Sequence, residues 1–315
     1  MNKINHIRLI VILLCSITLP GCIKEDLADC PVDQDISHYL TFEYTKNTDF
    51  VDKFADAVAT LDVFVFDSDG ILTGILSEEG TPLKNGNYRM ILDLPDGTYT
   101  FIIWGGSRKS YQISQATDHY RSMIGSARLD QLRLALNNNC TFENTDDLFH
   151  GIAQNVFIHS EQSSHTHISL TKNTNIINAK VYGISNLANA GNSMDVICSA
   201  ANGELNFDNS ISNPESLIQY IPVQTETKGE LKVGFKTLRL LTGMKSAFTI
   251  RNTNSNEEIF NHSLIELIKL LPDIHTDEDL DRNDVYDVEI YFDTNLSASV
   301  TINGYLVISS DQEIQ

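Results

Sequence analysis

The chain has 315 residues, 42% of them hydrophobic, and its 42 acidic residues outnumber its 22 basic ones to give a net charge of −20. A surface this acidic repels nucleic acid, so we expect no nucleic-acid partner. The hydrophobic content provides for packed cores and excludes a wholly disordered chain, and the length suits two domains.

The first residues have the pattern of an export signal. Lys3 and Arg8 form a short basic start, and residues 10–17 form an apolar run too short for a permanent membrane span. Small residues then precede Cys22, and this stretch, Leu19-Pro20-Gly21-Cys22, resembles the lipobox of bacterial lipoproteins. The resemblance implies cleavage after residue 21 and acylation of Cys22, which anchors a chain stably in a membrane. An ordinary secretory signal is the alternative.

A short charged segment follows the lipobox. Lys24, Glu25 and Asp26 resemble the tag that directs lipoproteins of some diderm anaerobes to the outer face of the outer membrane. We therefore expect a surface-facing protein that is held at the outer membrane by lipid.

The remaining cysteines leave the disulfide state open. Cys30, Cys140 and Cys198 are an odd number in an exported protein, so one disulfide with a free thiol and three reduced thiols are both compatible with the sequence. The sequence contains no C-x-x-C motif, so we expect no zinc site.

Alternation of apolar and polar residues predicts strands through the first half of the chain. These are residues 38–44, 61–66, 71–72, 88–94, 98–106 and 153–159. Residues 67–70 predict a hairpin turn, residues 49–58 a short helix, and residues 127–136 either helix or strand. Trp104 lies in a wholly apolar run, which indicates a core position.

The polar, small residues at 160–164 predict a domain boundary. The strands expected beyond it are residues 166–170, 176–184, 231–241, 247–252, 285–292, 300–302 and 305–308. Ser263 and Pro272 delimit a short helix, and Asn303-Gly304 predicts a hairpin.

This pattern predicts an all-β fold with short helices, built as two tandem antiparallel β-sandwiches. The expected organisation is a signal peptide at 1–21, a tether at 22–36, an N-terminal sandwich at 37–162 and a C-terminal sandwich at 163–315.

A set of landmarks in this order resembles the FimB-like anchor subunits of type V fimbriae. They are Cys22, Cys30-Pro31, Val63-Phe64-Val65-Phe66-Asp67 with Asp69-Gly70, Gly97-Thr98-Tyr99, Trp104-Gly105-Gly106, Leu148-Phe149-His150-Gly151 and Ile302-Asn303-Gly304-Tyr305. His150 and Tyr305 depart from the tyrosine and tryptophan expected there. The resemblance implies transthyretin-like sandwiches without catalysis, cofactor or small-molecule substrate, with fimbrial stalk subunits as partners.

In this family, stalk subunits lose a first strand to a protease and accept a strand from a neighbour. Residues 22–88 contain no arginine at which such a cleavage would occur, so this chain is expected to keep its first strand and to donate. The expected donor lies at residues 299–308, with Val300, Ile302, Tyr305 and Val307 as its key side chains. The alternative is that this hairpin is simply the last strand pair of the C-terminal sandwich.

Three other functions compete with anchoring. Asp67 and Asp69 after an apolar strand resemble the first motif of haloacid-dehalogenase-like phosphatases, although Ile71 replaces the expected hydroxyl residue. A surface glycan-binding lipoprotein is the second alternative. Metal binding at His165 and His167, or by the acidic residues at 277–284, is the third.

Overall fold

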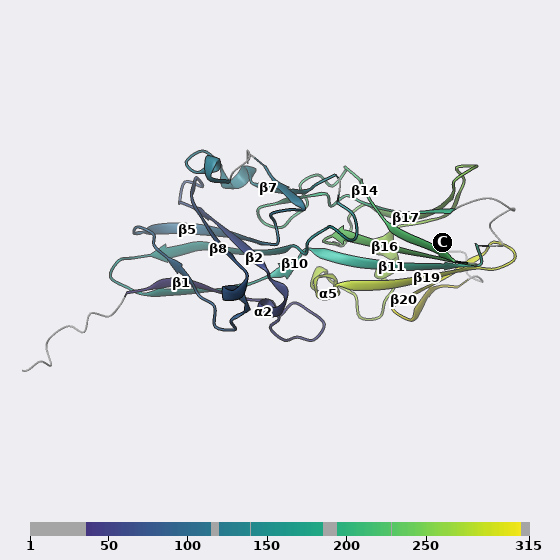
Figure 1. The fold of residues 1–315 in the computed structure, drawn as a ribbon, viewed down its shortest axis with the longest axis horizontal. Coiled ribbons are helices and arrows are strands. Elements are labelled where there is room, and N and C mark those ends of the chain that lie inside the picture. The colour runs from purple at the N-terminus through teal and green to yellow at the C-terminus, as the bar shows by residue number, and fades with distance from the viewer. Residues whose placement is uncertain (1–35, 115–119, 139, 185–193, 228, 310–315) are drawn as a thin grey trace, which may run out of the picture. The chain divides into compact units, whose positions relative to one another are not determined.

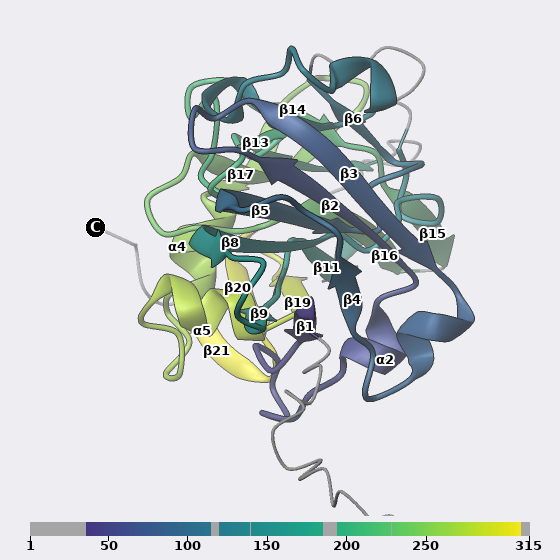
Figure 2. The ribbon, with the colours of Figure 1, turned by 90° about the vertical axis from the view of Figure 1, so that its left-hand side faces the viewer.

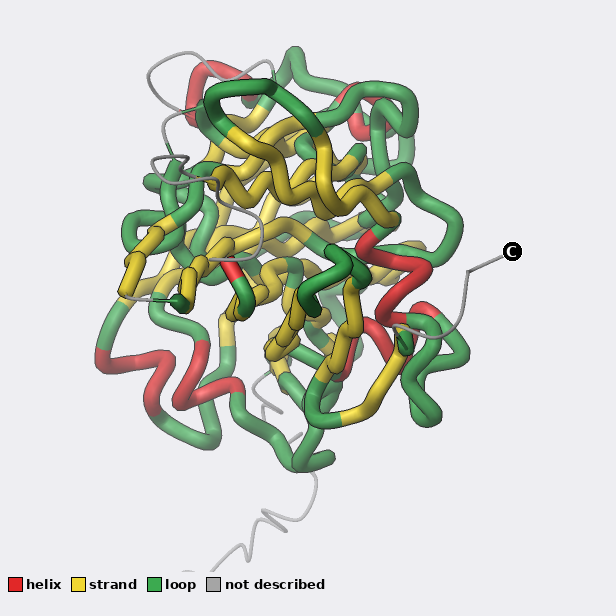
Figure 3. Tube along the Cα trace, turned by 90° about the vertical axis from the view of Figure 1, so that its right-hand side faces the viewer, coloured by secondary structure: helices red, strands yellow, loops and turns green. Residues whose placement is uncertain are grey.

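The computed structural model describes residues 36–114, 120–138, 140–184, 194–227 and 229–309. Ser37–Gln315 forms one compact unit. Strands dominate this unit, and its helices are short segments between them (Figure 3). The prediction of a mainly antiparallel all-β fold with short helices is confirmed.

The bounds of the elements are as follows. The strands of the first half are β1 (His38–Glu43), β2 (Thr60–Phe66), β3 (Leu72–Glu79), β4 (Met90–Leu92), β5 (Gly97–Gly105), β6 (Tyr111–Ile113), β7 (Arg133–Leu136), β8 (Phe149–Ile158), β9 (Ser164–Ser169) and β10 (Thr171–Lys172). Those of the second half are β11 (Thr174–Tyr182), β12 (Met194–Ala200), β13 (Glu204–Asn206), β14 (Ile218–Tyr220), β15 (Val223–Thr227), β16 (Glu230–Leu238), β17 (Ser246–Asn252), β18 (Glu258–His262), β19 (Val285–Phe292), β20 (Ala298–Ile302) and β21 (Tyr305–Ile308). The helices are α2 (Phe54–Ala57), η2 (Thr81–Lys84), η3 (Tyr120–Met123), η4 (Leu129–Gln131), α4 (Leu264–Ile268) and α5 (Asp277–Arg282).

Three sheets form the N-terminal part. Sheet A has the order β4-β1-β9, sheet B has the order β10-β8-β5-β2-β3, and sheet C has the order β13-β7-β6. One hydrophobic core lies between sheets A and B, and a second lies on the other face of sheet B against sheet C. The strands β8, β5, β2 and β3 of sheet B run side by side in Figure 2.

The burial of sheet B on both faces explains its sequence. In β2 the side chains of Val63 and Val65 enter the first core, while those of Phe64 and Phe66 enter the second. Because both faces are covered, the strand is a continuous apolar run and does not alternate. Trp104 of β5 is fully buried in the second core, as its apolar run predicted.

Two sheets form the C-terminal part. Sheet D has the order β15-β16-β11-β19-β20-β21, and sheet E has the order β14-β12-β17-β18 (Figure 1). A single core lies between them, and α4 packs into it. Ser263 caps α4 by accepting a hydrogen bond from the backbone N–H of Glu266, which confirms the predicted helix start.

The strand pairing does not follow the expected boundary after residue 162. β9 pairs in parallel with β1, and β10 pairs with β8, so both strands complete sheets of the N-terminal part. β11 then begins sheet D. By pairing, the change from one set of sheets to the other falls at Asn173, except that β13 returns to pair with β7 in sheet C. The division into two domains stays a proposal.

Candidate functional site

The N-terminal residues expected to carry the anchor lie outside the described part of the chain. These are Cys22, the tag residues Lys24, Glu25 and Asp26, and Cys30. Among the described residues, none of the helices is long and apolar enough to cross a membrane.

The expected donor residues form the last hairpin of sheet D. β20 pairs with β19 on one side and with β21 on the other. Asn303 and Gly304 connect β20 to β21 with positive φ angles of 50° and 83°, as a tight hairpin turn requires. β21 ends the sheet order, so β20 is its only strand partner in the described structure.

The four donor side chains have different environments. Val300 and Ile302 of β20 are fully buried in the core between sheets D and E. Tyr305 of β21 is 53% exposed, while Val307 packs partly against the core. β21 therefore has an open backbone edge and few deeply buried side chains, whereas β20 is held from both sides.

A charged cluster connects the N-terminal and C-terminal sheets. The Lys172 ammonium lies 3.2 Å from a carboxylate oxygen of Asp147 and 3.3 Å from one of Asp284. Lys236 lies 2.7 Å from the other Asp147 oxygen, and the Tyr44 hydroxyl donates to Asp284 at 3.0 Å. The residue after β1, the segment before β8, the strands β10 and β16, and the residue before β19 thus contribute to one network.

Within this cluster the pKa values of the two carboxylates are shifted in opposite directions. Burial opposes ionisation of Asp147, yet Lys172 and Lys236 together hold its pKa below the usual value. Burial raises the pKa of Asp284 against the opposing effect of Lys172. Asp147 therefore ionises more readily than Asp284, and its ion pairs with Lys172 and Lys236 are the stronger link between the N-terminal and C-terminal sheets.

Two further contacts fix the loop that follows β13. Arg239 forms a two-point ion pair with Asp281 of α5, at 2.6 and 2.7 Å, and also donates to the Asn209 carbonyl. The buried His150 ring nitrogen Nε2 lies 2.8 Å from the Phe207 carbonyl oxygen. These interactions were not predicted, because residues far apart in sequence form them.

The surroundings of Asp67 are those of a hairpin turn. Its carboxylate accepts hydrogen bonds from the backbone N–H groups of Asp69 and Ile71. The preceding strand β2 is antiparallel to both neighbours, β3 and β5. The phosphatase motif belongs to a parallel sheet, so this environment accounts for the two aspartates as turn residues.

The candidate metal residues are engaged in other contacts. Thr41 Oγ1 lies 2.7 Å from His165 Nε2 and 2.9 Å from His167 Nδ1 on the outer face of sheet A. Residues 277–282 form α5, with a capping box between Thr276 and Asp279. Within the described residues, no group of three or more His, Cys, Asp or Glu side chains is arranged to hold a metal ion.

Of the described cysteines, Cys140 is partly exposed and Cys198 is buried, and both are free thiols. Burial raises the pKa of Cys198 to about 12, so this thiol is protonated and behaves as a core residue.

Comparisons with known proteins agree on one family. The model of the family described as fimbrillin-A associated anchor proteins Mfa1 and Mfa2 matches residues 27–311. The minor fimbrium anchoring subunit Mfa2 of Porphyromonas gingivalis is 25% identical over 341 aligned residues, covering 100% of both chains.

Solved structures share the fold. The fimbrial anchor protein Mfa2 from Porphyromonas gingivalis superposes with a TM-score of 0.69 at 20% identity, covering 87% of this chain and 99% of that one. A candidate polysaccharide-binding protein from Bacteroides thetaiotaomicron superposes with a TM-score of 0.74 at 23% identity, covering 89% of this chain and 99% of that one.

Proposed function

Because this chain belongs to the family of fimbrillin-A associated anchor proteins, we propose that it holds a fimbrium at the outer membrane through lipid on Cys22 and joins a stalk subunit by β-strand addition. The family match over most of the chain is the observation that carries this proposal. The proposal has a membrane part and a polymer part, and each can be tested separately.

The membrane part rests on the sequence around Cys22. The apolar run, the small residues before the cysteine and the charged tag after it together favour acylation and surface display. In a Cys22→Ala strain, we expect fimbriae to be shed into the medium, as measured by the ratio of released to cell-bound fimbrial protein. The matched control is Cys140→Ala, which removes a partly exposed thiol outside the lipobox. Normal retention of fimbriae in the Cys22→Ala strain would refute lipid anchoring.

The polymer part rests on the edge position of β21. An edge strand presents unpaired N–H and C=O groups along one side, which is what strand addition uses. Since Val300 and Ile302 are buried between neighbouring strands, we assign the joining role to β21 and its following residues, with β20 remaining in sheet D.

Two deletions test this assignment. Removing residues 305–315 deletes β21 and the tail, whereas removing residues 310–315 deletes only the tail. We expect the longer deletion to abolish co-purification of stalk subunits. The shorter deletion separates the contribution of the strand from that of the tail. Thermal unfolding of both variants checks that sheet D still folds, since Ile308 packs into the core. Normal stalk capture by the folded longer deletion would overturn the assignment.

A further inference from the structure

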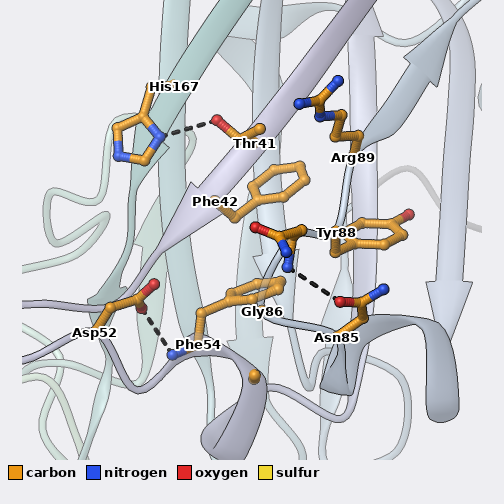
Figure 4. Close-up of a pocket in the computed structure, with 11 residues that line it drawn as sticks. Thr41, Phe42, Asp52, Phe54, Asn85, Gly86, Tyr88, Arg89 and His167 are labelled. Atoms are coloured by element: carbon orange, nitrogen blue, oxygen red, sulfur yellow. Dashed lines mark hydrogen bonds between the residues drawn. The ribbon is translucent and has the colours of Figure 1, made fainter.

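A cavity of about 290 Å³ opens beside β1, at the point where its neighbour β4 begins. We call it the β1 pocket. Six of its lining residues carry the argument. Asn87 is one of them, and the other five are labelled in Figure 4: Phe42, Asp52, Phe54, Tyr88 and Arg89. Its volume is at the lower end of the range found for small-molecule sites, about 300–1,000 Å³.

Three aromatic rings form one wall of the β1 pocket. The Phe42 ring is nearly parallel to Phe54 and to Tyr88, with centroid separations of 5.6 and 6.3 Å and interplanar angles of 18° and 21°. Phe42 and Phe54 are buried, and Tyr88 is partly exposed. Burial, together with a hydrogen bond to Glu78, raises the pKa of Tyr88 to about 12, so its hydroxyl is protonated at neutral pH. The wall is therefore apolar, uncharged and fixed by packing.

Polar groups that can form further hydrogen bonds surround this aromatic wall. Asp52 Oδ1 accepts hydrogen bonds from the backbone N–H groups of Tyr44 and Phe54, both at 2.9 Å, which fixes the carboxylate in place. No described residue donates to its second oxygen, Oδ2. The loop that carries Asn87 is ordered by a hydrogen bond from the Asn87 N–H to Asn85 Oδ1 at 3.2 Å. The rim thus offers a preorganised acceptor and exposed side-chain amides.

Arg89 is held at the rim without a hydrogen-bond acceptor. Its guanidinium carbon lies 4.7 Å from the centroid of the Tyr39 ring, and Tyr39 stacks on His165 at 4.7 Å. Among arginines whose side chains the structure describes, Arg89 alone donates no hydrogen bond to a described residue.

We propose that the β1 pocket binds a neutral pyranose sugar. The apolar C–H groups of a pyranose suit the aromatic wall, where Tyr88 is partly exposed, and sugar hydroxyls both donate and accept, as the carboxylate, amides and guanidinium of the rim require. Asp52 lines the pocket, Glu78 bonds to its wall and the whole chain is acidic, so an anionic sugar is disfavoured. This site is independent of the anchoring role.

The test uses the full chain in detergent solution and methyl pyranosides of glucose, galactose, mannose and N-acetylglucosamine, with methyl glucuronide as the anionic probe. Saturation-transfer NMR detects contact, and calorimetric titration measures affinity. We expect at least one neutral sugar to bind with a millimolar dissociation constant and to bind more tightly than methyl glucuronide.

Four variants locate the binding. Tyr88→Ala and Arg89→Ala should each weaken it at least about tenfold, whereas Tyr88→Phe keeps the ring and should bind like the parent chain. Tyr182→Ala removes a partly exposed tyrosine that stacks on Tyr291 in sheet D, so it should leave binding unchanged. Arg89 is exposed, so its variant tests the site even where Tyr88→Ala disturbs folding.

Three outcomes would overturn the proposal. The first is that no neutral sugar in the panel binds. The second is that methyl glucuronide binds more tightly than every neutral sugar. The third is that binding persists unchanged in folded Tyr88→Ala and Arg89→Ala.

Discussion

Gly106, which follows β5, is the position where a single methyl group should be most damaging. Its φ angle is 76°, and a Cβ atom added there would lie 1.8 Å from the Asp147 carbonyl oxygen. An L-residue in the left-handed region costs about 1–2 kcal/mol, and moving packed backbone to relieve overpacking costs about 1–3 kcal/mol more. We therefore expect Gly106→Ala to lower the free energy of unfolding by about 2–5 kcal/mol, out of roughly 5–15 kcal/mol for a typical domain.

Gly80 provides the matched control for this substitution. Its φ angle is 75°, yet no heavy atom of a described residue lies within 4 Å of its added Cβ. Gly80→Ala should therefore show only the conformational cost, about 1–2 kcal/mol. Urea unfolding followed by far-ultraviolet circular dichroism measures both variants, because the midpoint reports stability and the slope reports the surface exposed.

The difference between the two variants isolates the contact with Asp147. If Gly106→Ala and Gly80→Ala lose the same stability, the contact does not constrain the backbone and the reasoning is wrong. If Gly106→Ala loses more stability than Gly80→Ala, the displacement of Asp147 should also weaken its contacts with Lys172 and Lys236. Limited proteolysis between residues 173 and 174 would then be faster in Gly106→Ala.

Two further predictions concern buried polar groups. Asp281→Asn breaks the buried ion pair with Arg239 and should lower the free energy of unfolding in urea by about 3–5 kcal/mol. The control Glu278→Gln removes an exposed ion pair of α5 and should lower it by under about 1 kcal/mol. Equal losses in the two variants would contradict this prediction. Burial lowers the pKa of His150 to about 4 from an unfolded value near 6.5. Since the unfolded chain then binds a proton that the folded chain does not, stability should fall as the pH drops from about 6.5 to 4, by of order 3 kcal/mol. His150→Phe should reduce this dependence, and an unchanged pH profile would contradict the assignment.

The sequence predicted the strands whose partners are close along the chain. The hairpin of β20 and β21 follows from Asn303-Gly304, and the predicted alternation of β19 agrees with the burial of Tyr286, Val288, Ile290 and Phe292. In these cases a tight turn determines which strands pair, and the alternation of side chains every two residues determines which of them are buried. Periodicity alone was sufficient there.

Pairing between distant segments could not be predicted in the same way. β9 pairs with β1 across 126 residues, and β13 pairs with β7 of the N-terminal part. Alternation shows which side chains face a core but not which strand lies alongside, because any strand edge offers the same backbone groups. This is why the expected boundary at residue 162 separated strands that the structure pairs.

The β1 pocket was missed for a related reason. Its rim comes from the outer face of β9 together with the segment before α2 and the loop before β4, and neither of these last two has a periodic pattern. His165 and His167 were singled out as a candidate metal pair, but their link through Thr41 depends on the parallel register with β1. Loop sites arise from tertiary contacts that a single sequence does not report.

The distribution of burial along the last hairpin limits how this subunit can join a polymer. Releasing β20 would expose Val300 and Ile302, each fully buried, at about 1.5–3 kcal/mol per side chain, and would break ladders on both sides. Releasing β21 breaks one ladder and exposes mainly Ile308 and part of Val307. A partner that pairs with the whole of residues 299–308 must offset the larger free-energy cost of releasing β20, whereas a partner that uses β21 leaves most of the C-terminal core intact. The smaller rearrangement suits the proposed anchoring role, because the C-terminal core stays folded, and this is why we propose β21 as the joint.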